Sequence, residues 1–109
     1  MLRTKRQRLL LARTCPLAKV ADIIGDSATL LIIRDLASKA RGFTDLELSL
    51  QGISSRTICN RLKVLEKHGM VTRIPKADFY PRVNWRLTEK GRALSGIIAA
   101  MRAYGKKYL

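Results

Sequence analysis

Between Ser54 and Gly69, apolar and polar positions separate onto two sides of a helix with a period of about 3.6 residues. Ile58, Leu62 and Leu65 fall on one side. The other side carries three cations and one amide: Arg56, Asn60, Lys63 and Lys67. Ser54 fits the N-terminal cap and Gly69 the left-handed C-terminal cap. The pattern predicts a helix that packs its aliphatic side on a core and presents positive charge to an acidic partner.

Two further helices are predicted before this one. Pro16 fits the first position of a helix that ends at Gly25. Asp26 or Ser27 then caps a second helix, whose run over residues 30–33 is apolar nearly all round. Such a run is typical of a helix that is buried in the centre of a fold.

A short third helix is predicted over residues 45–50. We expect a turn over residues 39–42 and an extended segment at Phe43 to precede it. Thr44 and Glu47 match a capping box, in which a Thr hydroxyl and a Glu carboxylate bind the free amides of a helix start.

The C-terminal part predicts a hairpin and a last helix. Two strand-like runs, 70–74 and 83–87, flank a proline-bounded loop over residues 75–81. Thr88 then caps a helix of about residues 89–108. Two helices joined by a tight turn and followed by a basic hairpin form a winged helix-turn-helix. The expected fold class is therefore mainly α, with a small β-hairpin wing.

The length of 109 residues, 47% of them hydrophobic, favours one folded domain, which we expect over residues 15–109. Residues 1–14 form a basic N-terminal arm with no acid and five cations: Arg3, Lys5, Arg6, Arg8 and Arg13. Three arrangements fit this composition: a frayed arm, a solvated tail, or a short amphipathic helix that lies on a partner.

The charge balance identifies the class of partner. Twenty-two Lys and Arg residues stand against eight Asp and Glu residues, which gives a net charge of +14. The excess is concentrated, because residues 54–92 contain ten bases and three acids. A charge that only keeps the surface soluble would not need this concentration. Double-stranded DNA is the expected partner.

Other classes of function are excluded by the inventory. No apolar run approaches the roughly 20 residues that a membrane span requires, and Leu9 to Leu11 is too short for a signal-peptide core, so a cytoplasmic protein is expected. Two cysteines and a single histidine, without a Cys-x-x-Cys pair, predict no structural metal and no cofactor. Scattered acids and the lack of a glycine-rich phosphate loop argue against an enzyme.

From Cys15 to about Tyr108 the chain resembles the HxlR-type winged helix-turn-helix transcriptional regulators. The matching motifs are Cys15-Pro16, Ile24-Gly25, residues 29–33, 41–46, 52–57, 61–66, 69–71, 81–83 and 87–91. The resemblance implies a homodimer that binds an inverted-repeat operator. In some members, the cysteine before the proline senses oxidants or electrophiles. The pair Ser27-Ala28 departs from the family, whose members usually carry Lys-Trp there.

The predicted recognition helix supplies the candidate DNA contacts. Four residues of its first two turns are within reach of base edges: Ser55, Arg56, Thr57 and Asn60. Arg56 fits guanine and Asn60 fits adenine, each with a discrimination of about 1–3 kcal/mol. Three others fit phosphate contacts: Ser54, Arg61 and Lys63. The alternative, a salt-bridged exposed surface, is less favoured because Glu66 is the only acid on this helix.

The hairpin supplies further cations at Arg73, Lys76 and Arg82. They fit contacts with the DNA backbone or the minor groove, or alternatively the charge that protects a hairpin edge. A competing function is non-specific or architectural binding of nucleic acid, which the charge alone would support.

Cys15 is a candidate redox-sensing residue. Cys15 precedes a helix start, where the positive end of the helix dipole stabilises a reactive thiolate, although a lone cysteine is most often an inert apolar residue. The last helix has apolar positions at alternating steps of three and four: Leu94, Ile97, Met101, Tyr104 and Tyr108. This spacing predicts a dimer seam that the N-terminal helix shares, so N- and C-terminal dimerisation helices are expected, with packing on its own domain as the alternative.

Overall fold

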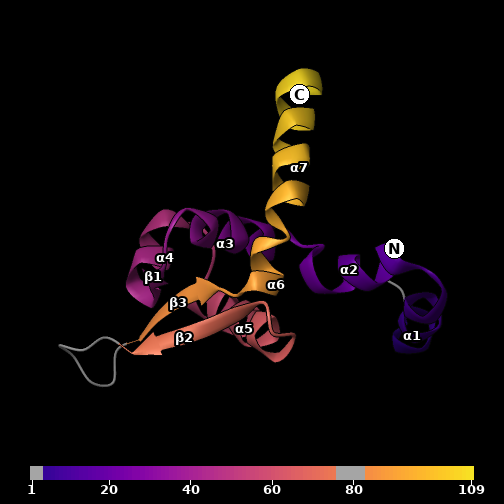
Figure 1. Ribbon diagram of the computed structural model, residues 1–109, viewed down its shortest axis with the longest axis horizontal. Helices are drawn as coiled ribbons and strands as arrows, with labels where there is room; N and C mark the ends of the chain where they lie inside the picture. The colour runs from indigo at the N-terminus through magenta and orange to yellow at the C-terminus, as the bar shows by residue number, and fades with distance from the viewer. Residues whose placement is uncertain (1–3, 76–82) are drawn as a thin grey trace.

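The computed structural model describes residues 4–75 and 83–109 (Figure 1). The helices are α1 (Lys5–Thr14), α2 (Pro16–Ile24), α3 (Ser27–Ser38), α4 (Phe43–Ser49), α5 (Ser55–Lys67), α6 (Glu89–Arg92) and α7 (Ser95–Tyr108). The strands are β1 (Arg41–Gly42), β2 (Val71–Pro75) and β3 (Val83–Leu87). The chain is mainly helical with a small hairpin after α5, so the predicted winged helix-turn-helix is confirmed.

A small antiparallel sheet forms one side of the domain. Its strand order is β1-β3-β2, and Val71 pairs with Leu87 while Arg73 pairs with Trp85. Val71, Trp85 and Leu87 are buried, since alternate side chains of a strand point to the same face. The short strand predicted at Phe43 is present as β1, but it lies at Arg41–Gly42, within the expected turn.

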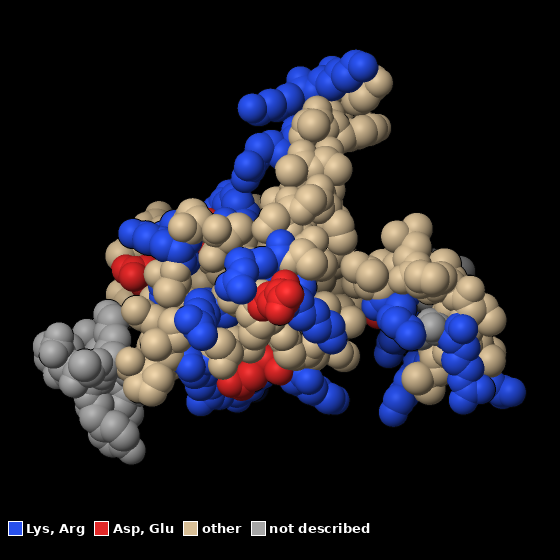
Figure 2. Space-filling view, viewed as in Figure 1, with Lys and Arg blue, Asp and Glu red and all other residues tan. Residues whose placement is uncertain are grey.

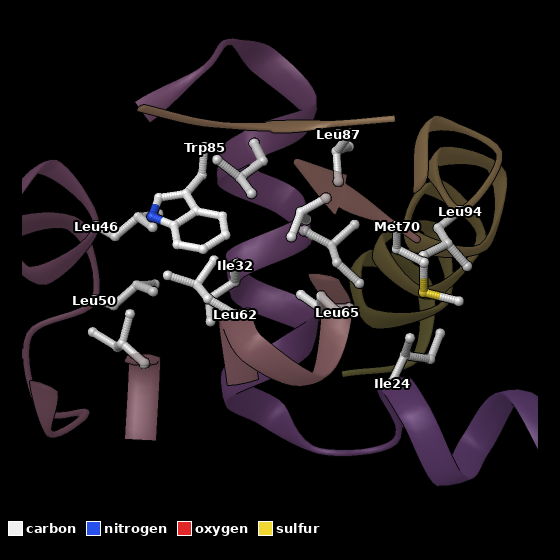
Figure 3. Close-up of a cluster of buried hydrophobic side chains, with 14 residues drawn as sticks. Ile24, Ile32, Leu46, Leu50, Leu62, Leu65, Met70, Trp85, Leu87 and Leu94 are labelled. Atoms are coloured by element: carbon white, nitrogen blue, oxygen red, sulfur yellow. The ribbon is translucent and has the colours of Figure 1, made fainter. Parts of the chain in front are cut away.

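The hydrophobic core lies between α3, α5 and the sheet (Figure 3). Ile32 and Ile33 of α3 are completely buried. Ile58, Leu62 and Leu65 of α5 are 0–1% exposed, so the predicted aliphatic side of this helix does face the core. Burying each of these side chains contributes roughly 1.5–3 kcal/mol, which fixes the rotation of α5 about its own axis.

The predicted helix caps at Asp26 and Ser54 are confirmed, and the Cys15 sulfur provides a further cap. The Cys15 sulfur, an Asp26 carboxylate oxygen and the Ser54 hydroxyl oxygen each accept a backbone N–H three residues later, at distances of 3.4, 2.9 and 3.1 Å. Gly69 follows α5 with a φ of 73°, a backbone conformation that glycine adopts without strain. In addition, Thr4 and Gln7 form a capping box, so most of the basic N-terminal arm is helical.

The prediction for the start of α4 is wrong. Phe43 is the first residue of the helix rather than an extended residue, and the cap residue, Gly42, makes no side-chain hydrogen bond. Pairing of Arg41 and Gly42 with β3 fixes the backbone just before the helix, so the helix begins earlier than Thr44. The predicted capping box of Thr44 and Glu47 is therefore absent. Glu47 instead accepts a hydrogen bond from the Ser55 hydroxyl.

The predicted last helix is divided. Thr88 caps α6, which ends at Arg92, and α7 begins at Ser95. The break lets α6 lie against β3, while α7 leaves the domain as a single projecting helix (Figure 1). No helix in the described residues is long and apolar enough to cross a membrane.

Candidate nucleic-acid interface

The helix-turn-helix is formed by α4, a tight turn and α5. The amide of Ile53 donates to the carbonyl of Leu50 at 3.0 Å, and Gly52 takes a φ of 97°. A side chain at this φ would be strained, so the turn favours glycine. Leu50 is buried and Ile53 packs on the core, which anchors the turn on both sides.

The side of α5 that faces solvent is cationic. We call the set formed by Arg56, Asn60, Lys63 and Lys67 the basic face of α5. All four side chains are exposed. Within residues 4–75 and 83–109, none of them forms a hydrogen bond or an ion pair with another side chain. Their donors are therefore available to a ligand.

The three hydroxyl residues at the start of α5 stabilise the turn. The Ser54 hydroxyl donates to Thr57 Oγ1 at 3.0 Å and accepts from the Thr57 amide. The Ser55 hydroxyl donates to the carboxylate of Glu47 in α4. These predicted contact residues lie beside Arg56 and Asn60 on the first turns of α5, and the bond from Ser55 to Glu47 joins α5 to α4.

Arg61 lies apart from the basic face. Its Nε donates to Asp26 Oδ1 at 3.2 Å. Asp26 also accepts from the amide and the hydroxyl of Thr29, both at 2.9 Å, and so caps α3. The sequence predicts the cap but not the ion pair. Asp26 therefore joins the start of the central helix to the middle of α5.

Arg73 is bound to α5 by its side chain. Its Nε and Nη2 donate to the two carboxylate oxygens of Glu66 at 3.0 and 3.2 Å. The guanidinium also lies 5.0 Å from the ring centroid of Trp85. Lys76 and Arg82, the other two predicted wing contacts, lie outside the described residues.

Positive charge is visible at the surface of this region. Figure 2 shows Lys and Arg side chains along the lower edge of the molecule, below α5 and around α1, with few acids among them. No group of three His, Cys, Asp or Glu side chains in the described part of the chain could hold a metal ion. The arrangement is suited to an extended anion.

Cys15 lies at the junction of α1 and α2. Its side chain is half-buried, and its sulfur accepts from the amide of Ala18 at 3.4 Å. The sulfur is therefore at the positive end of α2, in the position that was predicted.

The predicted seam residues divide into two groups. Leu94 is 7% exposed and belongs to the core of its own domain. Ile97, Met101, Tyr104 and Tyr108 are 40–62% exposed on α7. Ile97 and Met101 also line an apolar groove of about 370 Å³ with residues of α2, α3 and the turn between them: Leu17, Val20, Ala21, Ile24, Gly25 and Leu30. Exposed apolar side chains that adjoin an apolar groove make this surface a candidate for an interface.

Comparison with solved structures places this geometry among known regulators. The transcription factor PA1607 superimposes with a TM-score of 0.79 and 35% identity, over 88% of this chain and 66% of that chain. This chain thus spans just under two thirds of PA1607. The redox regulator HypR in its oxidised form superimposes with a TM-score of 0.80 and 26% identity, over 87% of this chain and 98% of HypR.

Sequence comparison gives the same result. An HTH-type transcriptional regulator of Synechocystis sp. is 33% identical over 95 residues, which cover 87% of this chain and 70% of the relative. The profile of the HxlR-like helix-turn-helix family matches residues 23–109. Because that match spans the helix-turn-helix, the hairpin and the projecting helix together, the chain belongs to the HxlR-like helix-turn-helix family and is, like its relatives, a transcriptional regulator rather than an enzyme.

Proposed function

We propose that this regulator binds DNA sequence-specifically, as a homodimer on an inverted-repeat operator. The observation that supports the proposal is the basic face of α5, whose donors have no partner within the described residues. In a helix-turn-helix, the second helix enters the major groove with its N-terminal residues toward the bases. Arg56 would then bind guanine and Asn60 adenine, while Lys63 and Lys67 lie along the phosphates.

The remaining predicted contacts have supporting roles in this proposal. Ser54, Ser55 and Thr57 hold the turn and reach the bases or phosphates at the start of α5. Arg61 keeps its terminal NH2 groups for a phosphate while its Nε holds Asp26. Lys76 and Arg82 of the wing approach the DNA backbone or the minor groove.

Non-specific coating of DNA is the second candidate, and the net charge of +14 favours it. The two candidates differ in the ratio of affinities for the best site and for random DNA. A specific regulator has a ratio of about 10³ or more, whereas a coating protein has a ratio near one. The test is to select a site from a randomised duplex library and to measure this ratio with and without the Arg56 side chain.

A homodimer is proposed because two half-sites require two recognition helices. The exposed apolar positions of α7 and the adjoining groove offer the surface that a second copy would cover: Ile97, Met101, Tyr104 and Tyr108. Leu94 supports this seam from inside its own domain.

Met101→Glu is expected to raise the dimer dissociation constant by roughly 30-fold or more, because an unpaired carboxylate would be buried at the centre of the seam. Sedimentation velocity over a range of concentrations measures the change. Ala103→Glu is the matched control, since it adds the same charge to the opposite side of α7 and is expected to leave dimerisation unchanged. Equal behaviour of the two variants would argue against the seam.

We also propose that Cys15 modulates DNA binding. Its sulfur caps α2, and α2 adjoins the groove of the proposed dimer. A similar fold occurs in the redox regulator HypR, which supports the proposal by analogy. Hydrogen peroxide would convert the thiol to a sulfenic acid with release of water, which adds an oxygen atom at the helix start. The change would alter the junction of α1 and α2 and shift the spacing of the two recognition helices.

For the wild-type protein, peroxide is expected to weaken operator binding about tenfold, as a coupling free energy of 1–3 kcal/mol would produce. Cys15→Ser keeps a cap acceptor and is expected to bind the operator normally with and without peroxide. Cys59→Ser is the control, because it should retain the response of the wild type. Gel-shift titrations measure all six conditions. Identical affinities throughout would remove the switch and leave the DNA-binding proposal intact.

A further inference from the structure

Two side chains join the recognition helix to the wing. Glu66 lies on the last turn of α5, and Arg73 lies in the middle of β2, which packs against α5 (Figure 1). The Arg73 guanidinium donates to both carboxylate oxygens of Glu66 and lies over the ring of Trp85 in β3. The Arg73 side chain of β2 therefore contacts both α5 and the other strand of the hairpin, β3.

The ion pair of Arg73 and Glu66 affects the orientation of the hairpin more than the stability of the fold. The two side chains are 51% and 36% exposed, and ion pairs that are this exposed contribute little to the free energy of unfolding. A bidentate arginine fork, however, fixes both the distance and the orientation of its partner. The rigid ring of Trp85 lies against the Arg73 guanidinium and further restricts its movement. The pair thus sets the angle of the wing more than it stabilises the fold.

The same contacts leave Arg73 poorly placed to bind DNA. Two of its nitrogen atoms are already bound to a carboxylate, which also neutralises its charge locally. Among the described residues, the cations of the basic face of α5 have no such partner. Lys76 follows Arg73 by three residues in the sequence, beyond the end of β2.

We propose that Arg73 is a positioning residue, which acts through Glu66 and Trp85 to hold the wing at a fixed angle to the recognition helix. This inference rests on the proposed function, because it assigns a role within the same DNA interface. It replaces direct DNA contact as the role of Arg73 and leaves such contacts in the wing to residues beyond β2.

The two roles predict opposite signs for Glu66→Gln. If Arg73 bound phosphate, removal of the acid would release its guanidinium, remove a negative charge near DNA and tighten binding. If Arg73 positions the wing, the same substitution weakens operator binding, by about 3- to 30-fold. Arg73→Lys keeps the charge but lacks the planar fork, so we expect it to weaken operator binding to a similar extent.

The experiment measures operator affinity, its salt dependence and the hydroxyl-radical footprint for the wild type, Glu66→Gln and Arg73→Lys. Glu89→Gln is the matched control, since it removes one exposed acid from α6 and should not weaken binding. The expected result is weaker operator binding and loss of the outer footprint in Glu66→Gln and Arg73→Lys, and neither change in Glu89→Gln. Tighter binding by Glu66→Gln, or wild-type binding by Arg73→Lys, would overturn the proposal.

A second measurement separates this inference from the DNA-binding proposal. Hydrogen exchange of the β2 and β3 amides in the free protein is expected to accelerate in Glu66→Gln and Arg73→Lys, with no change in the midpoint of urea unfolding. Unchanged exchange would refute the positioning role even if DNA binding is confirmed. Accelerated exchange in a protein that does not discriminate DNA sequences would support the positioning role and refute the specific operator.

Discussion

Arg56→Ala is expected to reduce the discrimination between operator and random duplex by about ten- to a hundredfold, while binding to random duplex changes only about threefold. A bidentate arginine–guanine pair contributes about 1–3 kcal/mol of discrimination, whereas a single lost charge weakens all sequences alike. Arg56 is well placed for this role, because it is exposed on the first turn of α5. Fluorescence anisotropy with the selected operator and with random duplex, at several salt concentrations, gives both values.

Lys67→Ala is the matched control on the same helix. Lys67 lies on the last turn of α5, away from the end that enters the groove, and carries the same charge. Loss of the Lys67 charge is expected to weaken binding to both duplexes equally. It should also reduce the salt dependence of the binding constant by about 0.9, the value for one phosphate contact. If Arg56→Ala gives the same uniform result, the protein binds by charge alone and the operator proposal fails.

Gly91→Ala is expected to lower the free energy of unfolding by about 3–5 kcal/mol, the range of severe overpacking. A Cβ atom at this position would lie 2.0 Å from the carbonyl oxygen of Met70 and 3.1 Å from a methyl carbon of Leu87. Because the first of these is a backbone atom, a rotamer change cannot relieve the clash. Urea unfolding, followed by circular dichroism, measures the loss.

Gly96→Ala is the control for this substitution. It lies in the first turn of α7, and a Cβ there would meet no atom within 4 Å. It should raise the stability by up to about 1 kcal/mol, because alanine loses less backbone entropy in a helix than glycine does. Similar stabilities of the two variants would show that α6 does not lie as closely on Met70 as the structure indicates.

Local patterns in the sequence predict much of this fold. The side of α5 that packs on the core follows from the spacing of Ile58, Leu62 and Leu65, and the structure confirms it. The caps at Asp26 and Ser54 are also local, because a cap residue and its amide lie three positions apart. Signals of this kind need no knowledge of the rest of the chain.

The features that were missed depend on contacts between distant segments. Asp26 and Arg61 are 35 positions apart, and only the packing of α3 on α5 brings them together. The pairing of β1 with β3 likewise decides where α4 begins. The break before Ser95 arises where α6 meets Met70 and β3, so a helical period across it could not reveal two helices. The residues that support the candidate interface are therefore harder to predict than those on its surface.

α7 leaves its own domain as a helix of 14 residues, and the apolar side chains of its outer half are exposed. Helices of this length are barely stable in water when nothing packs on them. If the proposed dimer forms, packing of a second subunit would stabilise the outer half. Under that proposal, a cell with few copies of this regulator would hold mainly monomers with a partly unfolded C-terminus, so the abundance of the chain would itself control how much of it is competent to occupy a promoter.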